Sequence, residues 1–294
     1  MWQLQNRTPF AAERAFVRDK NGAETWVVAV KATFTIYPDG STTLAEQQAA
    51  VCMAPQYRGD PLKSSLLYDS DLVHTKPGTD ILLHGHAYAP SGKPVLWVQV
   101  EMQVGNLVKR LQVFGNRYWE KGLFGLKMTS PEPFTKLPII YELAFGGVDE
   151  FASTQRVLEE RNPVGLGFAI KAEHLIEQRV ANIEDPTHLI TSWKQRPQPM
   201  GFGPLARHWL PRRQFAGTYD VQWEKTRQPL LPEDFDERFY LCAPPDQQVT
   251  GYLRGGEPVV LYNLSPNSSV SRFQLPSQSP PRFKTWLGKK IVES

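Results

Sequence analysis

Six carboxylates in this sequence have the residue type and spacing that could support catalysis. They form two groups: Asp69, Asp71 and Asp80, and then Glu224, Asp234 and Asp236. Glycoside hydrolysis needs two carboxylates on either side of one bond at a set separation. The pairs at 69–71 and 234–236 stand beside aromatic residues and prolines, where carboxylates commonly fix turns. The sequence leaves a carbohydrate-processing or carbohydrate-binding protein open and favours structural carboxylates.

Two histidines and two cysteines are the remaining candidates for metal or redox chemistry. His84 and His86 would point from one face of a strand, with His74 nearby in sequence. A zinc site needs three or four ligands, and no carboxylate or cysteine stands at a suitable spacing. Cys52 and Cys242 are far apart in sequence, so we expect buried, reduced thiols. We therefore predict no metal site and no cofactor.

No motif of nucleophilic or phosphate-binding chemistry is present. The glycine pairs at 165–167 and 201–203 lack the Gly-Lys-Ser/Thr of a phosphate loop, and no Gly-x-Ser-x-Gly elbow occurs. We therefore predict no catalytic residue and no enzymatic activity. A platform for single-stranded nucleic acid would use a mixture of basic and aromatic residues such as Lys109, Arg110, Arg117, Tyr118 and Trp119. A net charge of +3 is too small to support that interpretation, so no nucleic-acid partner is expected.

The segment 197–239 has the densest mixture of proline, glycine, arginine and large aromatic residues. Such a composition predicts an ordered loop system pinned by aromatic side chains, and structured loops often carry binding surfaces. Arg, Trp and Tyr dominate interface hot spots. The residues predicted to bind a protein are Trp209, Arg212, Phe215, Tyr219 and Trp223. The alternative is that Trp209 and Trp223 fill the core beneath the loops.

A second set of residues in this part of the chain is predicted to shape the backbone rather than to bind. Glycine, asparagine, aspartate and proline set tight turns, each through its own backbone preference. The members of this structural set are Asn162, Pro163, Gly165, Gly201, Gly203, Pro204, Gly217 and Asp220.

The elements that would position these residues are mostly short strands. Between 26 and 36, Val28, Val30, Ala32, Phe34 and Ile36 alternate with polar residues, which indicates a half-buried strand. The runs 95–104 and 107–114, joined by a Gly-Asn turn, predict a hairpin. Short or mixed patterns at 151–161 and 170–178 are the only helix candidates. The remaining strands are expected at 81–88, 139–145, 238–243, 249–253, 259–264 and 270–275.

Composition agrees with a mainly β protein. The chain has 294 residues with 25 prolines and 21 glycines, which favours turns over long helices, and 41% hydrophobic residues, enough for a sizeable core. We expect an antiparallel β-sandwich or meander with long ordered loops and few short helices. Residues 1–276 would form one domain, with two β lobes at about 1–145 and 146–276 as the alternative, followed by a basic tail at 277–294. No signal peptide or membrane-spanning run is found, so a cytoplasmic protein without stable membrane insertion is expected.

Several motifs in a fixed order together resemble one bacterial family. Asn6 and Thr8-Pro9-Phe10 begin the match, and the segment 197–239 belongs to it. Between them lie the phrases at 30–34, 68–72, 76–80, 89–92, 141–147 and 162–167. The sequence resembles the bacterial family of unknown function that is encoded beside type VI secretion effectors, over about residues 6–276.

The resemblance implies an adaptor or chaperone for a secreted toxin. Such a protein would bind the toxin effector in the cytoplasm and help to load it onto the spike protein of the secretion machine. The family has no established enzymatic activity and no catalytic residues to transfer. Its members usually continue into a further hydrophobic strand region after Pro276, whereas this chain ends in a short basic tail, which predicts a truncated C-terminal sheet.

Overall fold

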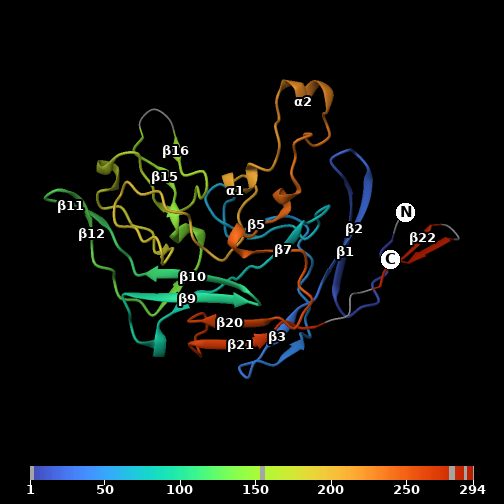
Figure 1. Cartoon of the computed structure of the whole chain (residues 1–294), viewed down its shortest axis with the longest axis horizontal. Coiled ribbons are helices and arrows are strands. Elements are labelled where there is room, and N and C mark those ends of the chain that lie inside the picture. The colour runs from blue at the N-terminus through green and yellow to red at the C-terminus, as the bar shows by residue number, and fades with distance from the viewer. Residues whose placement is uncertain (1–2, 153–155, 278–281, 288–289, 294) are drawn as a thin grey trace.

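The largest element of the fold is a five-stranded antiparallel sheet. The computed structural model describes residues 3–152, 156–277, 282–287 and 290–293. The strand order in this sheet is β18-β10-β9-β20-β21 (Figure 1). The bounds are β9 (Trp97–Val104), β10 (Leu107–Phe114), β18 (Ile183–Glu184), β20 (Pro258–Tyr262) and β21 (Val270–Gln274).

The hairpin β9–β10 forms the centre of this sheet, and its sequence explains why. Val98, Val100, Met102 and Val104 alternate with more exposed residues, so one face of β9 lies in the core. Leu107 pairs with Val104 at the turn, and the register continues to Phe114 opposite Trp97. The predicted strands 95–104 and 107–114 and their hairpin are therefore confirmed.

Most other strands pair in short two-stranded ribbons around this sheet. The pairs are antiparallel except for β14 with β17. The ribbons of the described residues are β1 (Ala11–Arg18) with β2 (Glu24–Lys31), β3 (Phe34–Ile36) with β4 (Thr42–Leu44), β5 (Gln56–Tyr57) with β6 (Leu66–Tyr68), β7 (Gly78–Asp80) with β19 (Gln248–Thr250), β8 (His86–Tyr88) with β13 (Lys136–Pro138), β11 (Trp119–Gly122) with β12 (Gly125–Met128), β14 (Phe145–Gly146) with β17 (Leu166–Gly167), β15 (Val148–Asp149) with β16 (Val157–Leu158), and β22 (Lys284–Leu287) with β23 (Lys290–Glu293).

Helices are few and short. The two α-helices of the described residues are α1 (Leu210–Arg213) and α2 (Val221–Thr226), both inside the loop segment 197–239. The single-turn 3-10 helices are η1 (Pro90–Gly92), η2 (Tyr141–Leu143), η3 (Ala172–Leu175), η4 (Glu237–Tyr240) and η5 (Pro245–Gln247). The prediction of a mainly β, antiparallel protein with few short helices is confirmed. Within the described residues, no helix is long and apolar enough to span a bilayer.

Several predicted strands are wrong in whole or in part. The run 238–243 begins inside η4, and 139–145 contains η2 and only the first residue of β14. In 81–88 only β8 at its end is a strand, and 249–253 is a strand only as far as Thr250. The run 26–36 is interrupted between β2 and β3. In 139–145 and 238–243, apolar residues such as Ile139 and Leu241 are buried by tertiary packing rather than by a sheet, which periodicity alone does not distinguish.

Three further predictions concern the helix candidates and the chain end. The run 170–178 holds the 3-10 helix η3, while 151–161 contains β16 and includes residues 153–155 outside the described part. The strands at 259–264 and 270–275 are confirmed as β20 and β21. The predicted tail at 277–294 includes the paired strands β22 and β23.

One side-chain cluster forms the main core. It combines β9 and β10 with side chains from the loops, among them Tyr141, Phe202 and Trp209. A second cluster gathers around Trp119 and Phe145. The loop segment 197–239 therefore enters the core at its start and leaves it again as a projection that contains α2 (Figure 1).

Candidate interaction surface

The first carboxylate pair is engaged in structural contacts. The side chain of Asp69 is only 6% exposed and accepts from Arg212 Nη1 at 2.8 Å and Arg207 Nη2 at 2.9 Å. Asp71 pairs with Lys31 Nζ at 3.0 Å and accepts the backbone N–H of Cys52 at 2.8 Å. These bonds tie segments that are far apart in the sequence, through a nearly inaccessible carboxylate at Asp69 and an exposed one at Asp71.

The other carboxylates also fix the chain. Asp80 accepts the N–H groups of Cys242 at 3.0 Å and Ala243 at 2.9 Å, and pairs with Lys76 at 2.6 Å. Asp236 closes a local turn by accepting the N–H of Arg238 at 2.9 Å, whereas Asp234 accepts from Thr218, sixteen residues earlier. Glu224 lies exposed in the first turn of α2. Each of these carboxylates except Glu224 thus has a structural partner, which is the second of the two interpretations that the sequence leaves open.

The histidines and the basic residues do not form the sites that their spacing suggests. His84 lies before β8 rather than on it, contacts Arg58 Nη2 at 3.2 Å and packs edge-on against Tyr68. Lys109 is buried against Asp246 and Gln247, and Arg117 is buried against Glu184. Among the described residues, no three His, Cys, Asp or Glu side chains gather as metal ligands.

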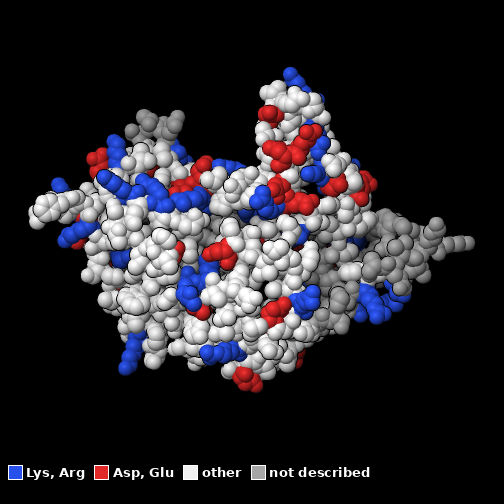
Figure 2. All heavy atoms as spheres, viewed as in Figure 1, with Lys and Arg blue, Asp and Glu red and all other residues white. Residues whose placement is uncertain are grey.

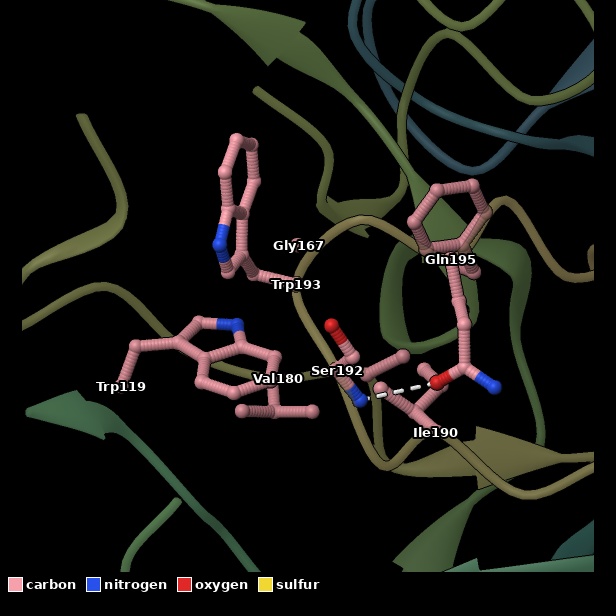
Figure 3. A pocket seen from close by; sticks show the side chains of 9 residues that line it. Trp119, Gly167, Val180, Ile190, Ser192, Trp193 and Gln195 are labelled. Atoms are coloured by element: carbon pink, nitrogen blue, oxygen red, sulfur yellow. Dashed lines mark hydrogen bonds between the residues drawn. The ribbon is translucent and has the colours of Figure 1, made fainter. Parts of the chain in front are cut away.

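A small pocket lies at the second core cluster (Figure 3). Trp119 and Trp193 lie along one side of it, and Ser192 N donates to Gln195 Oε1 at 2.8 Å on the other. The pocket has a volume of about 10 Å³, about what a single water molecule needs. A pocket of this size therefore holds one water molecule and no larger ligand.

Two of the five predicted binding residues lie in the interior. Trp209 has an exposed fraction of 0% and packs edge-on against Tyr141, with ring centroids 5.4 Å apart. Arg212 is 2% exposed and donates to Leu205 O at 2.8 Å and Phe239 O at 2.8 Å. The expectation that both lie on the docking face is therefore corrected: they hold the loops onto the core.

The ion pair of Arg212 with Asp69 makes the fold sensitive to acid. Burial alone would raise the pKa of Asp69, but the guanidinium groups of Arg212 and Arg207 outweigh it and hold the pKa below its ordinary value. The contribution of Asp69 to stability is thus full above the unfolded-state pKa of about 3.9 and is lost as pH falls through the lowered pKa.

We expect Asp69→Asn to have a lower free energy of unfolding than the wild type at pH 7. The difference between the two free energies should stay constant down to about pH 5 and become smaller below about pH 4. Urea unfolding of both proteins between pH 7 and pH 2 measures this difference. A difference in the free energy of unfolding that stays constant down to pH 2 would show that the charge of the Asp69 carboxylate does not contribute to stability.

Phe215, Tyr219 and Trp223 lie along or beside a projection that we call the finger, residues Gly217–Asp234. The finger contains α2 and extends away from the rest of the chain (Figure 1). At its base, Thr218 donates to Asp234 through its N–H at 2.9 Å and its hydroxyl at 2.8 Å. Phe215 is half-buried just before it, with the Arg238 guanidinium 4.3 Å from its ring centroid.

Glycine is required where the finger leaves the core. Gly217 has φ of +80°, a conformation that favours glycine, and a Cβ there would lie 2.7 Å from Pro232 Cβ. Three residues later Asp220 caps α2 by accepting the N–H of Trp223 at 2.8 Å. The structural roles predicted for Gly217 and Asp220 therefore have a geometric basis.

Internal contacts hold the finger in one shape. Trp223 Nε1 donates to Leu230 O at 2.8 Å, across the finger, and Tyr219 packs edge-on against Trp223 with centroids 4.7 Å apart. Arg227 donates to Leu231 O at 2.8 Å and to Lys20 O at 2.8 Å, which lies in the turn between β1 and β2. The finger is thus braced both internally and against the β1–β2 ribbon.

The exposed side of the finger combines apolar and charged groups. Tyr219 is 54% and Val221 is 62% exposed. Figure 2 shows acidic and basic side chains interspersed with uncharged atoms over α2. A rigid projection with exposed aromatic and apolar side chains and a charged margin has the composition of a protein-binding surface.

The structural set around Asn162 fixes the loops behind this region. Asn162 is fully buried and donates from Nδ2 to Tyr141 O at 2.8 Å and Phe145 O at 3.0 Å. Its own carbonyl accepts from Gly147 N and Gly165 N. Pro163 lies in the turn that follows. The backbone segments cross so closely here that only small residues fit between them.

The remaining members of this set lie where the loop segment enters the core. Gly201, Gly203 and Pro204 are all buried, and a Cβ on Gly201 would lie 3.0 Å from the ring of Tyr141. A Cβ on Gly203 would make only ordinary contacts, at 3.9 Å from the His84 ring and 4.0 Å from the Tyr141 ring. Close approach thus explains Gly201 but not Gly203.

Strand β1, and with it the pairing of the β1–β2 ribbon, was not predicted from the sequence. A signal for it exists, because Asn21-Gly22 is a strong hairpin indicator and lies between the two strands. Sequence reasoning also missed Val221 and Arg227, whose importance depends on where the finger points. No local pattern reports that direction.

Comparison with known proteins places the chain in a family. Residues 21–293 match a family model described as an uncharacterized protein conserved in bacteria (DUF2169). No curated protein matches the chain. No solved structure matches it either. Because the match covers most of the 294 residues, the chain belongs to this bacterial family.

Proposed function

We propose that the protein is a non-enzymatic adaptor that binds a type VI secretion toxin in the cytoplasm and helps to load it onto the secretion spike. The resemblance described above suggests this class of partner. The observation that carries the proposal is the finger, which is braced at its base and presents Tyr219 and Val221 to solvent. The core around Trp209 and Arg212 supports that surface without taking part in it.

The finger suits docking because its shape is fixed before a partner arrives. Binding costs less when the contacting side chains are already ordered. The hydrogen bonds of Thr218 to Asp234 and of Trp223 to Leu230 supply that order. Fully burying a fully exposed aliphatic side chain contributes roughly 1.5–3 kcal/mol, and Tyr219 and Val221 are 54% and 62% exposed, so covering each would contribute about 1–2 kcal/mol. Such a moderate gain suits a partner that must later be released to the spike.

The partner surface that fits the finger is an apolar one with polar edges. Tyr219 offers a ring and a hydroxyl, so its partner can be apolar over the ring and still accept a hydrogen bond. The charged residues on α2, Glu224 and Lys225, would lie at the margin of the contact, where they influence association rate and specificity. We place an apolar stretch of the toxin in this position, where binding would shield it from aggregation.

The proposal is tested by co-expressing the chain with a toxin encoded beside its gene. We expect the toxin to be several-fold more soluble and to co-purify with the chain, and the double variant Tyr219→Ser, Val221→Ser to lose both effects. Tyr252→Ser is the matched control, because Tyr252 is 77% exposed and lies outside the finger. A toxin that is equally soluble and equally well secreted without the chain would contradict an adaptor role.

A further inference from the structure

The β1–β2 ribbon has apolar residues that the fold leaves incompletely covered. All sixteen residues of Ala11–Arg18 and Glu24–Lys31 are half-buried or exposed, and none is fully buried. Phe16, which packs edge-on against Trp26, is 51% exposed. Antiparallel sheets normally cover one face with the core. An isolated two-stranded ribbon is marginal without further strands or packing.

The register of the ribbon determines which backbone groups point outward. Asp19 N donates to Ala23 O at 3.0 Å, so these residues form a hydrogen-bonded pair at the turn. Hydrogen-bonded and non-hydrogen-bonded pairs then alternate along the register. Val28 opposite Arg14 and Val30 opposite Ala12 are therefore non-hydrogen-bonded pairs. The N–H and C=O groups of all four residues point away from the ribbon.

Neither outer edge of the ribbon is paired with another strand of the described chain. β1 pairs with β2 alone in its sheet. Among the residues that the structure describes, no backbone hydrogen bond joins Val28 or Val30 to a segment outside the ribbon. Two outward N–H groups two residues apart, with the carbonyls beside them, are the groups that a third strand would bond.

The two edges differ in how they are protected against pairing. Natural proteins protect edge strands with charged residues, proline or bulges. β1 carries Glu13, Arg14 and Arg18 along its length. β2 has no charge and no proline from Thr25 to Val30, and its register is regular. Within the described part of the chain, the outer edge of β2 at Val28 and Val30 is therefore the one open to another strand.

We infer that the outer edge of β2 accepts an extended strand of the partner protein as a third strand of the ribbon. This inference rests on the proposed adaptor function and names a second contact for the same partner. The incoming strand would bond the main chain at Val28 and Val30 and place alternate apolar side chains over the half-buried residues of the ribbon. A strand of about five residues spans these bonds, since each residue advances about 3.4 Å.

The position of the ribbon favours the same partner that binds the finger. Arg227 of the finger donates to Lys20 O at 2.8 Å and to Asn21 Oδ1 at 3.2 Å, in the turn of the ribbon. The finger and the ribbon are therefore directly joined. A partner seated against α2 lies next to the turn of the ribbon, so one chain can reach both.

A second copy of this chain is a poorer fit to the edge. In antiparallel pairing of two β2 edges, outward residues face outward residues. The backbone N–H and C=O groups of Glu24 point outward from the ribbon, whereas those of Lys31 point toward β1. Glu24 of one copy therefore cannot lie directly opposite Lys31 of the other in such a dimer. Nothing in the charges of the strand would then fix the register of a homodimer.

Hydrogen exchange on the purified complex with the co-purifying toxin tests the inference. We expect the N–H groups of Val28 and Val30 to exchange at least about tenfold more slowly in the complex than in the free protein, because exchange requires a hydrogen bond to open. Amides of the opposite edge, at Ala12 and Arg14, should not change. This measurement uses the wild-type protein and does not depend on the folding of a variant.

A matched pair of proline variants gives a second readout. Val28→Pro removes an outward donor from the β2 edge, and Arg14→Pro removes the outward donor of the residue opposite, on the β1 edge. We expect Val28→Pro to weaken toxin binding at least about tenfold, and Arg14→Pro to change it less than about threefold, because only the first loses a main-chain bond to the partner.

The outcomes separate the inference from the proposed function. A complex that forms while Val28 and Val30 exchange as in the free protein contradicts the inference and leaves the adaptor function standing. Slow exchange that depends on the concentration of the chain alone, with a dimer in solution, would assign the edge to a second copy and also contradict it. A chain that binds no toxin contradicts both.

Discussion

Arg212→Met should lower the free energy of unfolding by about 3–5 kcal/mol, the range observed when one partner of a buried ion pair is removed. Asp69 would remain buried with Arg207 as its remaining cationic partner, and the carbonyls of Leu205 and Phe239 would lose their donors. Methionine retains much of the side-chain volume, so the loss reports the hydrogen bonds and charge rather than a cavity.

The neighbouring arginine supplies the control for this variant. Arg213 is 50% exposed at its side chain and pairs with Glu160 at 2.9 Å. Exposed ion pairs contribute about 0–1 kcal/mol, so Arg213→Met should change the free energy of unfolding by no more than that. Urea unfolding followed by circular dichroism measures both variants. If both variants lost equally little free energy of unfolding, the assignment of Arg212 as a structural residue would be wrong.

The second large effect is expected at the crossing of the loops around Asn162. A Cβ on Gly165 would lie 2.6 Å from Ala144 O and 2.8 Å from Gly146 Cα, both of them backbone atoms that cannot move aside. Gly165→Ala should therefore lower the free energy of unfolding by about 3 kcal/mol, the upper end of the range for overpacking. It should also broaden the unfolding transition if the β14–β17 pairing is lost.

Gly59→Ala is the matched control for this substitution. The nearest atoms to a Cβ on Gly59 belong to Ser64, at 3.6 Å and 3.7 Å, which is ordinary contact. We expect its free energy of unfolding to stay within about 0.5 kcal/mol of the wild type. If Gly165→Ala were equally harmless, the loops would have to be free to separate at this point, and the account of Asn162 as the residue that joins them would be wrong.

The sequence was sufficient for the class of fold and for the strands with the clearest alternation. In β9 and β10 the alternating apolar residues and the Gly-Asn turn specify a hairpin without help from the rest of the chain. The runs at 139–145 and 238–243 have similar residues but form 3-10 turns, because their apolar side chains are buried by loops around them. A local pattern reports that a residue is buried and not what covers it.

The residues of the candidate surface were also only partly predictable from the sequence. Arginine and tryptophan occur in interfaces and in cores for the same physical reasons, so Trp209 and Tyr219 look alike in the sequence. Their separation, one buried and the other exposed on the finger, depends on the direction in which the loop leaves the core at Gly217. Among the carboxylates expected to fix turns, Asp236 does so through the N–H of Arg238. Asp69, Asp71 and Asp234 instead bond residues far away in the sequence, which no local pattern predicts.

The most direct test of the finger as a docking surface is the dissociation constant of the toxin for the wild type and for the Tyr219→Ser, Val221→Ser variant. Tyr219→Ser removes the ring contact with Trp223 but leaves the hydrogen bond from Trp223 to Leu230 O. We therefore expect the variant to stay folded with a small loss of thermal stability and to bind the toxin at least about tenfold more weakly. An unchanged dissociation constant in a folded variant would contradict docking on the finger.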